Sequence, residues 1–126
     1  MRGADIPVRT LAAAGVERLF TLSGNQIMSV FDACIGSGIE LVHVRHEAAA
    51  VHMADAWGRI TGQIGVCMYT TPGFANAIPG LTNALHSEAP LLSIAGCAEL
   101  ADLGRGAMQE IDQVGMAVPV AKGSFM

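Results

Sequence analysis

The chain has 126 residues, of which 52% are hydrophobic and 14% are charged, and its formal net charge is −4. This length suits one domain, and a charged fraction well below the usual roughly 25% predicts that much of the surface is covered by something else. The few Lys and Arg residues are scattered singly, which argues against a nucleic-acid partner. No apolar run approaches the roughly 18 residues that cross a bilayer, and no signal peptide is visible, so we expect a cytoplasmic protein without a membrane segment.

Strand-like and helix-like segments alternate along the chain with short links. The predicted helices have apolar residues at helical spacing and cover residues 6–14, 26–35, 47–60 and 74–86, and Gly15 and Gly62 act as stops. The apolar strands are expected at residues 18–22, 41–44, 65–69 and 90–95, with a turn at 23–25 and a loop at 70–73. This alternation predicts a doubly wound α/β fold, with a mostly parallel sheet and helices on both faces.

The alternation fails after Gly96. Residues 98–113 have no clean period and contain two glycines, so we expect a loop excursion with at most a short helix. Residues 118–125 resemble the approach to another strand. Because an α/β pattern that stops there leaves its last strand without a covering helix, we expect residues 1–126 to form one C-terminally incomplete domain.

Three cysteines, Cys34, Cys67 and Cys97, are widely separated and lie in apolar segments. Their odd number and their surroundings favour reduced thiols in the core over a disulfide or a zinc site.

The histidines do not form a metal-binding pattern. His43, His46 and His52 fall on a strand, a turn and a helix, and His86 is distant. Because zinc needs three or four convergent ligands, we expect no metal site and interpret these residues as ordinary core or interface histidines.

Glu47 is a single carboxylate between an apolar strand and an alanine-rich helix. As a surface acid in the first helical turn it would stabilise the helix dipole by about 0.3–1 kcal/mol, which is a sufficient structural role. However, apolar residues around most of the helix predict burial on more than one side, and the end of a parallel strand is where α/β sheets bind ligands. A carboxylate in such surroundings needs a partner, and Arg45 is one candidate.

Residues 70–76, with the sequence TTPGFAN, form a second candidate segment. Pro72 and Gly73 are typical of a tight turn into a helix, and Asn76 would be a hydrogen-bonding group in its first turn. A plain strand-to-helix turn and a ligand contact explain the segment equally well. No lysine follows, so this is not a nucleoside-triphosphate phosphate loop, and residues 104–106 lack the third glycine of a dinucleotide fingerprint.

Five motifs occur in register over nearly the whole chain. They are RHEAAA at 45–50, ADAWGR at 54–59, GVC at 65–67, PGFAN at 72–76 with GL at 80–81, and GAMQEIDQ at 106–113. Together they resemble the N-terminal pyrimidine-binding domain of thiamine-diphosphate enzymes, in the group of acetolactate synthase, 2-hydroxyacyl-CoA lyase and benzaldehyde lyase.

The resemblance implies a catalytic role for Glu47. Its carboxyl group would hydrogen-bond a ring nitrogen of the cofactor's aminopyrimidine and promote the imino tautomer, and hence formation of the ylid that attacks a carbonyl. A shielded acid shares a proton with a weakly basic ring better than a solvated one. The other implied contacts are Gly24, Pro72, Gly73 and Asn76 for the cofactor, and Gln26 and Gln109 for the substrate.

The same resemblance implies thiamine diphosphate as cofactor, with its diphosphate and Mg²⁺ held by a separate domain or subunit. The Gly-Asp-Gly that marks that domain is absent from this chain. FAD is left open, without support in the sequence. The complete enzyme would be a homo-oligomer, such as a homodimer. It would act as a carboligase, C–C lyase or decarboxylase on a 2-keto acid, a 2-hydroxyacyl-CoA or an aldehyde, and the isolated chain would be inactive.

Two departures from the family pattern leave the substrate open. Ser23-Gly24 stands where Pro-Gly is usual, and Met108 stands where Phe is common. The alternative to the enzyme hypothesis is a non-catalytic α/β interaction module or inactive fragment, in which Glu47 is only a helix-start acid.

Overall fold

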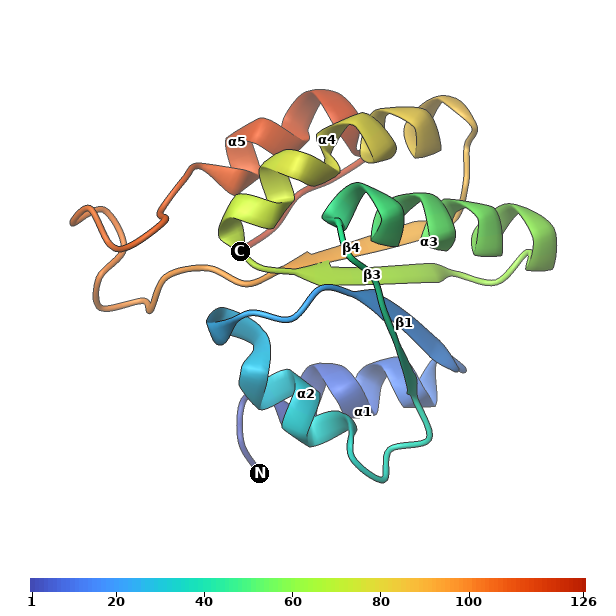
Figure 1. The fold of residues 1–126 in the computed structure, drawn as a ribbon, viewed down its shortest axis with the longest axis horizontal. Helices are drawn as coiled ribbons and strands as arrows, with labels where there is room; N and C mark the ends of the chain where they lie inside the picture. The colour runs from blue at the N-terminus through green and yellow to red at the C-terminus, as the bar shows by residue number, and fades with distance from the viewer.

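The computed structural model describes all residues from Met1 to Met126 and contains one four-stranded sheet (Figure 1). All strand pairs are parallel, and the strand order is β2-β1-β3-β4. The strands are β1 (Arg18–Thr21), β2 (Glu40–His43), β3 (Gly65–Tyr69) and β4 (Leu91–Ala95). The predicted doubly wound α/β fold is confirmed.

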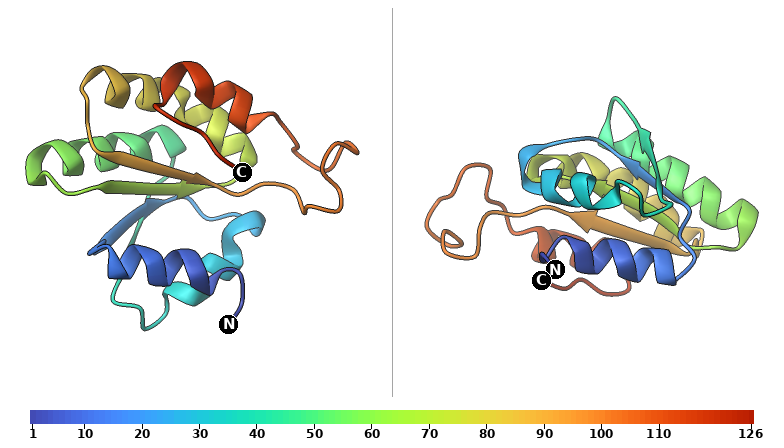
Figure 2. Two further views of the ribbon diagram at one scale, coloured as in Figure 1. Left: turned by 180° about the vertical axis from the view of Figure 1, so that it is seen from behind. Right: turned by 90° about the horizontal axis from the view of Figure 1, so that it is seen from below.

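Helices cover both faces of the sheet, as Figures 1 and 2 show from three sides. One face carries α1 (Asp5–Ala13) and α2 (Met28–Cys34), which follows the short 3-10 helix η1 (Asn25–Ile27). The other face carries α3 (Glu47–Thr61), α4 (Thr71–His86) and α5 (Gln113–Ala117), with the 3-10 helix η2 (Val118–Val120) after it. None of the helices has the length and apolar character that crossing a lipid bilayer requires.

The central strand β3 divides the core into two clusters because successive side chains of a strand point to opposite faces. Val66 and Met68 belong to the cluster under α1 and α2, and Cys67 and Tyr69 belong to the cluster under α3 and α4. All four side chains are fully buried. The strand therefore anchors both helical layers, and the residue after it is fixed in position.

Helix α3 begins and ends at residues suited to those positions. At its start the ring Nδ1 of His46 accepts a hydrogen bond from the backbone N–H of Ala48 at 3.2 Å. At its end Gly62 adopts a left-handed conformation with φ of 71°, which confirms the predicted glycine stop. The expectation that α3 is buried on more than one side is confirmed, because Ala54 lies against Gly65 of β3 and Val51 lies against Gly80 of α4, while Ala49 and Met53 are exposed on the outer face.

The predicted loop at residues 70–73 is wrong, because α4 already begins at Thr71. Proline fits the first helical turn, where its missing N–H needs no partner, so Pro72 does not delay the helix. Asn76 consequently lies in the second turn of α4 and not in the first.

The predicted strand approach at residues 118–125 is also wrong. The helix α5 and the 3-10 helix η2 occupy residues 113–120, and no strand follows them. The predicted loop excursion after Gly96 is confirmed, since residues 97–112 contain neither helix nor strand.

The buried carboxylate of Asp55 ties α3 to α4. Its Oδ2 accepts hydrogen bonds from Arg59 at 2.9 Å and from Asn83 of α4 at 3.0 Å, while its Oδ1 is buried without a partner. Removing either donor would leave a buried charge poorly compensated.

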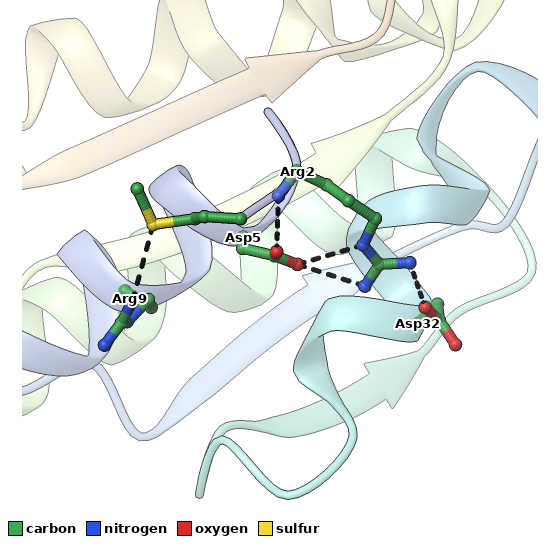
Figure 3. Close-up of polar contacts among 5 residues, drawn as sticks. Arg2, Asp5, Arg9 and Asp32 are labelled. Carbon is green, nitrogen blue, oxygen red and sulfur yellow. Dashed lines mark hydrogen bonds and ion pairs between the residues drawn. The ribbon is translucent and has the colours of Figure 1, made fainter.

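Polar contacts at the N-terminus lie on the opposite face, and those of Arg2 join α1 to α2. Arg2 donates to Asp5 at 3.0 Å and to Asp32 of α2 at 2.5 Å, and Arg9 donates to the sulfur of Met1 at 3.4 Å (Figure 3). These side chains lie at the surface, where such pairs add little to stability.

All three cysteines are free thiols. The predicted core position holds for Cys34 and Cys67, which are buried, but not for Cys97, which is only partly buried. Burial raises the pKa of Cys67 to about 12, and this thiol therefore stays protonated and unreactive at neutral pH.

The close packing of α3 on β3 can be tested by a substitution at Gly65, the first residue of β3. A Cβ atom at this position would overlap the backbone carbonyl of Ala54, which cannot rotate away. We expect Gly65→Ala to lower the free energy of unfolding by at least about 1–3 kcal/mol. Urea unfolding measures this change, and Gly3→Ala is the control because its Cβ would meet no atom within 4 Å. Equal stability of the two variants would contradict the packing described.

Candidate functional site

The segments that follow β1, β2 and β3 meet at one edge of the sheet, as parallel strands require. A Cβ atom on Gly24, after β1, would overlap the side chain of Thr70, after β3. A Cβ atom on Gly73 of α4 would lie 2.6 Å from Cγ and Oε1 of Glu47, at the start of α3. The segments that contain Gly24, Glu47 and Gly73 therefore lie together at this edge of the sheet.

Glu47 is half-buried, and its partner is an amide. Its Oε2 accepts a hydrogen bond from Nδ2 of Asn76 at 3.0 Å. The candidate partner Arg45 is wrong, because Arg45 forms no ion pair in the structure. Since a strand end changes direction at that point, the two neighbouring side chains do not meet. Glu47, Gly73 and Asn76 together form what we call the acid cluster.

A hollow of about 310 Å³ lies beside the acid cluster. It is lined by Gly24, Asn25, Gln26, Thr70, Pro72, Met108 and Gln109. Four of the residues singled out from the sequence, Gly24, Gln26, Pro72 and Gln109, therefore share one cavity, while Glu47, Gly73 and Asn76 lie outside its lining. Carboxamide and hydroxyl groups dominate this wall, and no ionisable side chain belongs to it.

Gln26 fixes the start of α4. Its Oε1 accepts hydrogen bonds from the backbone N–H and from Oγ1 of Thr71, both at 2.8 Å. Because a backbone N–H can only donate, the amide must turn its oxygen toward Thr71, and its Nε2 is left to donate to a ligand. The side chain thus both caps a helix and lines the hollow.

Sequence reasoning missed Thr71 and Gly96, which hold this edge together. Thr71 Oγ1 lies 3.0 Å from the carbonyl oxygen of Gly96, which also accepts from Nε2 of Gln113 at 3.1 Å. A Cβ atom on Gly96 would lie 2.7 Å from Cβ of Gln26. A glycine directly after an apolar strand is a sequence signal for such a close approach.

Tyr69 lies under the acid cluster and stays neutral. Burial raises its pKa, and the thiol of Cys67 and the negative charge of Glu47 act in the same direction. Its hydroxyl group bonds to Ser93 on β4. The aromatic ring of Phe74 packs on it at a centroid distance of 6.4 Å, so the floor beneath the cluster is largely apolar.

The histidines are not core residues, since all four are exposed. His46 caps α3, and the ring of His43 lies against Phe31 at a centroid distance of 5.5 Å. No group of three or more His, Cys, Asp or Glu side chains is arranged to hold a metal ion.

Residues 1–116 match the family described as "Thiamine pyrophosphate enzyme, N-terminal TPP binding domain". The chain is 42% identical over 129 residues to the acetolactate synthase isozyme 3 large subunit of Escherichia coli, covering 100% of this chain and 22% of that protein. It is 41% identical over 121 residues to 2-hydroxyacyl-CoA lyase 2 of Danio rerio, covering 95% of this chain and 20% of that protein. The chain thus spans about a fifth of these relatives, and the resemblance found in the motifs is confirmed.

The close approach of Gly73 to Glu47 can be tested in solution. A Cβ atom in Gly73→Ala would displace the carboxylate, and we expect the side-chain amide protons of Asn76 to lose their hydrogen-bonded chemical shift. Nuclear magnetic resonance (NMR) measures this shift directly. Ala75→Ser is the matched control, because Ala75 is an exposed residue of the same helix. An unchanged Asn76 signal in Gly73→Ala would show that the two residues are not in contact.

Proposed function

Because the chain belongs to the thiamine pyrophosphate enzymes, as their N-terminal TPP binding domain, we propose that its acid cluster binds the aminopyrimidine of thiamine diphosphate. The observation that carries this proposal is the carboxylate of Glu47. It is half-buried at the end of a parallel strand, and the amide of Asn76 holds its Oε2. Its Oε1 has no hydrogen-bond partner in the chain and is available to a ligand.

The residues present suit a flat heterocycle with ring nitrogens. The carboxyl group of Glu47 can accept or donate one hydrogen bond to a ring nitrogen, depending on its protonation. Gly73 and Gly24 have no side chains, which lets Glu47 and Thr70 lie directly against the backbone at these two positions. Pro72 and Asn76, both exposed on α4, complete the proposed cofactor contacts.

Glu47 is proposed to exchange a proton with a ring nitrogen of the aminopyrimidine, which favours the imino tautomer of that ring. Partial removal from water makes such proton sharing more effective than it is for a fully solvated acid. When bound, thiamine diphosphate supplies a carbon nucleophile and an electron sink next to a carbonyl group. The chain's own part is to orient the ring and to hold the proton at Glu47.

The hollow beside the acid cluster is the proposed substrate side. Gln26 can donate from Nε2, and Gln109 offers a second carboxamide on the opposite segment. These groups suit the carbonyl oxygen of a 2-keto acid, an aldehyde or a 2-hydroxyacyl-CoA. The reaction would be carboligation, C–C cleavage or decarboxylation, in keeping with the names acetolactate synthase and 2-hydroxyacyl-CoA lyase among the relatives.

The diphosphate and its Mg²⁺ are proposed to bind to another domain or subunit. This chain has no group of acidic, histidine or cysteine side chains that could hold a metal ion. A homo-oligomer would bring such a domain to the acid cluster. The low charged fraction of 14% supports extensive burial of this surface in the complete enzyme.

Complementation of the chain with a diphosphate-binding domain of an acetolactate synthase tests the proposal. Glu47→Gln keeps the size of the side chain and an acceptor for Asn76 but removes the exchangeable carboxyl proton. We expect it to lower the rate of carboligation or decarboxylation by about 10²–10⁴-fold. Circular dichroism should be unchanged.

The matched control is Glu40→Gln, because Glu40 is an exposed acid on β2 that pairs with Arg18 away from the acid cluster. Full activity of Glu47→Gln in the complemented enzyme would refute the proton-exchange role. Turnover by the isolated chain would refute the need for a second domain.

A further inference from the structure

Residues 97–112 form a long excursion between β4 and α5 that projects beyond the sheet (Figures 1 and 2). Its two ends are held together, because Nε2 of Gln113 donates to the carbonyl oxygen of Gly96 at 3.1 Å. Gln113 is 7% exposed, so this closure is inside the protein. The excursion is therefore a closed loop with a fixed neck, and its shape depends on contacts within it.

One carboxylate makes the main polar contacts inside the excursion. Oε1 of Glu110 accepts a hydrogen bond from the backbone N–H of Gly104 at 2.5 Å, and Oε2 accepts one from the N–H of Ala107 at 3.1 Å. The N–H of Glu110 in turn donates to the carbonyl oxygen of Ala107 at 3.0 Å. Gly104 and Gly106 have φ of 76° and 74°, a left-handed conformation that glycine adopts without strain.

The residue before Glu110 is held in an unfavourable backbone conformation. Gln109 has φ of 64°, which is uncommon for a residue with a side chain and persists only where its surroundings enforce it. Gln109 and Met108 are the two residues of the excursion that line the hollow. Met108 is 75% exposed, so packing alone does not fix it.

We propose that Glu110 is a positioning residue, whose carboxylate folds the excursion so that Met108 and Gln109 form one wall of the hollow. The hydrogen bonds from Gly104 and Ala107 to the Glu110 carboxylate close a turn directly before Met108 and Gln109. The backbone of Glu110 comes directly after these two wall residues. Met108 and Gln109 therefore lie in the chain between Ala107, whose N–H binds the carboxylate, and Glu110 itself. The significance for substrate binding rests on the proposed function, whereas the positioning itself does not.

The partners of the Glu110 carboxylate are backbone N–H groups and not charged side chains. None of the other ionisable residues of the excursion, Glu99, Asp102, Arg105 and Asp112, forms an ion pair with it. The N–H of Gly104 lowers the pKa of the Glu110 carboxyl, desolvation opposes this, and the N–H groups of Ala107 and Gly106 lower it further. A lowered pKa means that the contact is present above the ordinary glutamate range and is lost as the pH falls through the folded-state pKa.

An NMR titration of the chain with labelled methionine methyl groups tests the proposal. We expect the amide signals of Gly104 and Ala107, the methyl signal of Met108 and the side-chain amide of Gln109 to move together. Their common midpoint should lie below about 4.3, the ordinary glutamate pKa. In Glu110→Gln this shared transition should disappear, and hydrogen exchange at Gly104 and Ala107 should accelerate by about tenfold or more.

Glu99→Gln is the matched control, because Glu99 is an exposed acid of the same excursion whose side chain forms no ion pair. This variant should keep the transition. The proposal is overturned if Met108 and Gln109 keep wild-type signals in Glu110→Gln, or if the transition survives in that variant.

A second measurement uses the enzyme complemented with its diphosphate-binding domain. Glu110→Gln should raise KM for the carbonyl substrate several-fold while the affinity for thiamine diphosphate stays the same, because Glu47 and Asn76 are untouched. An equal loss of affinity for the carbonyl substrate and for thiamine diphosphate would contradict a role of Glu110 at the wall of the hollow. The NMR result does not depend on activity, so failure of the proposed function and failure of this inference can be distinguished.

Discussion

The site depends on how closely α3 lies against β3 and α4. Three glycines permit this approach. A Cβ atom on Gly65 of β3 would overlap Ala54, and one on Gly80 of α4 would lie 2.8 Å from Cγ1 of Val51. A Cβ atom on Gly73, at the start of α4, would lie 2.6 Å from Glu47. Because dense packing transmits small displacements, the contacts at Gly65 and Gly80 also fix the contact between Gly73 and Glu47. The Glu47 carboxylate is therefore held against α4 by the core beneath it, and its hydrogen bond to Asn76 sets its direction.

The two halves of the site differ in how they are built. The acid cluster lies on two long helices whose inner faces are buried, which suits a group that must keep one geometry. The wall of the hollow lies on the segment after β1 and on an excursion that contains neither helix nor strand. Loops on a rigid scaffold often carry binding residues, so under the proposed function these two segments are the ones that would contact the substrate.

The sequence was sufficient to predict the alternation of strands and helices, the parallel sheet and the position of Glu47, because each follows from local periodicity and from the geometry of βα units. It was not sufficient for contacts between distant segments. Pro72 and Gly73 look like a loop in sequence, yet they begin α4, and Gly73 is needed because Glu47 lies against it. Gln26 lines the hollow, but no sequence pattern indicates that its oxygen binds Thr71, a residue 45 positions away. Local patterns carry no information about such partners.

The most direct test of the account is the ¹⁵N NMR shift of the aminopyrimidine ring in labelled thiamine diphosphate bound to the complemented enzyme. If Glu47 shares its proton with a ring nitrogen, that nitrogen should move toward its protonated value in the wild-type enzyme and remain at the free-ligand value in Glu47→Gln. The same ring-nitrogen shift in both proteins would contradict the assignment of Glu47 as the group that contacts the cofactor.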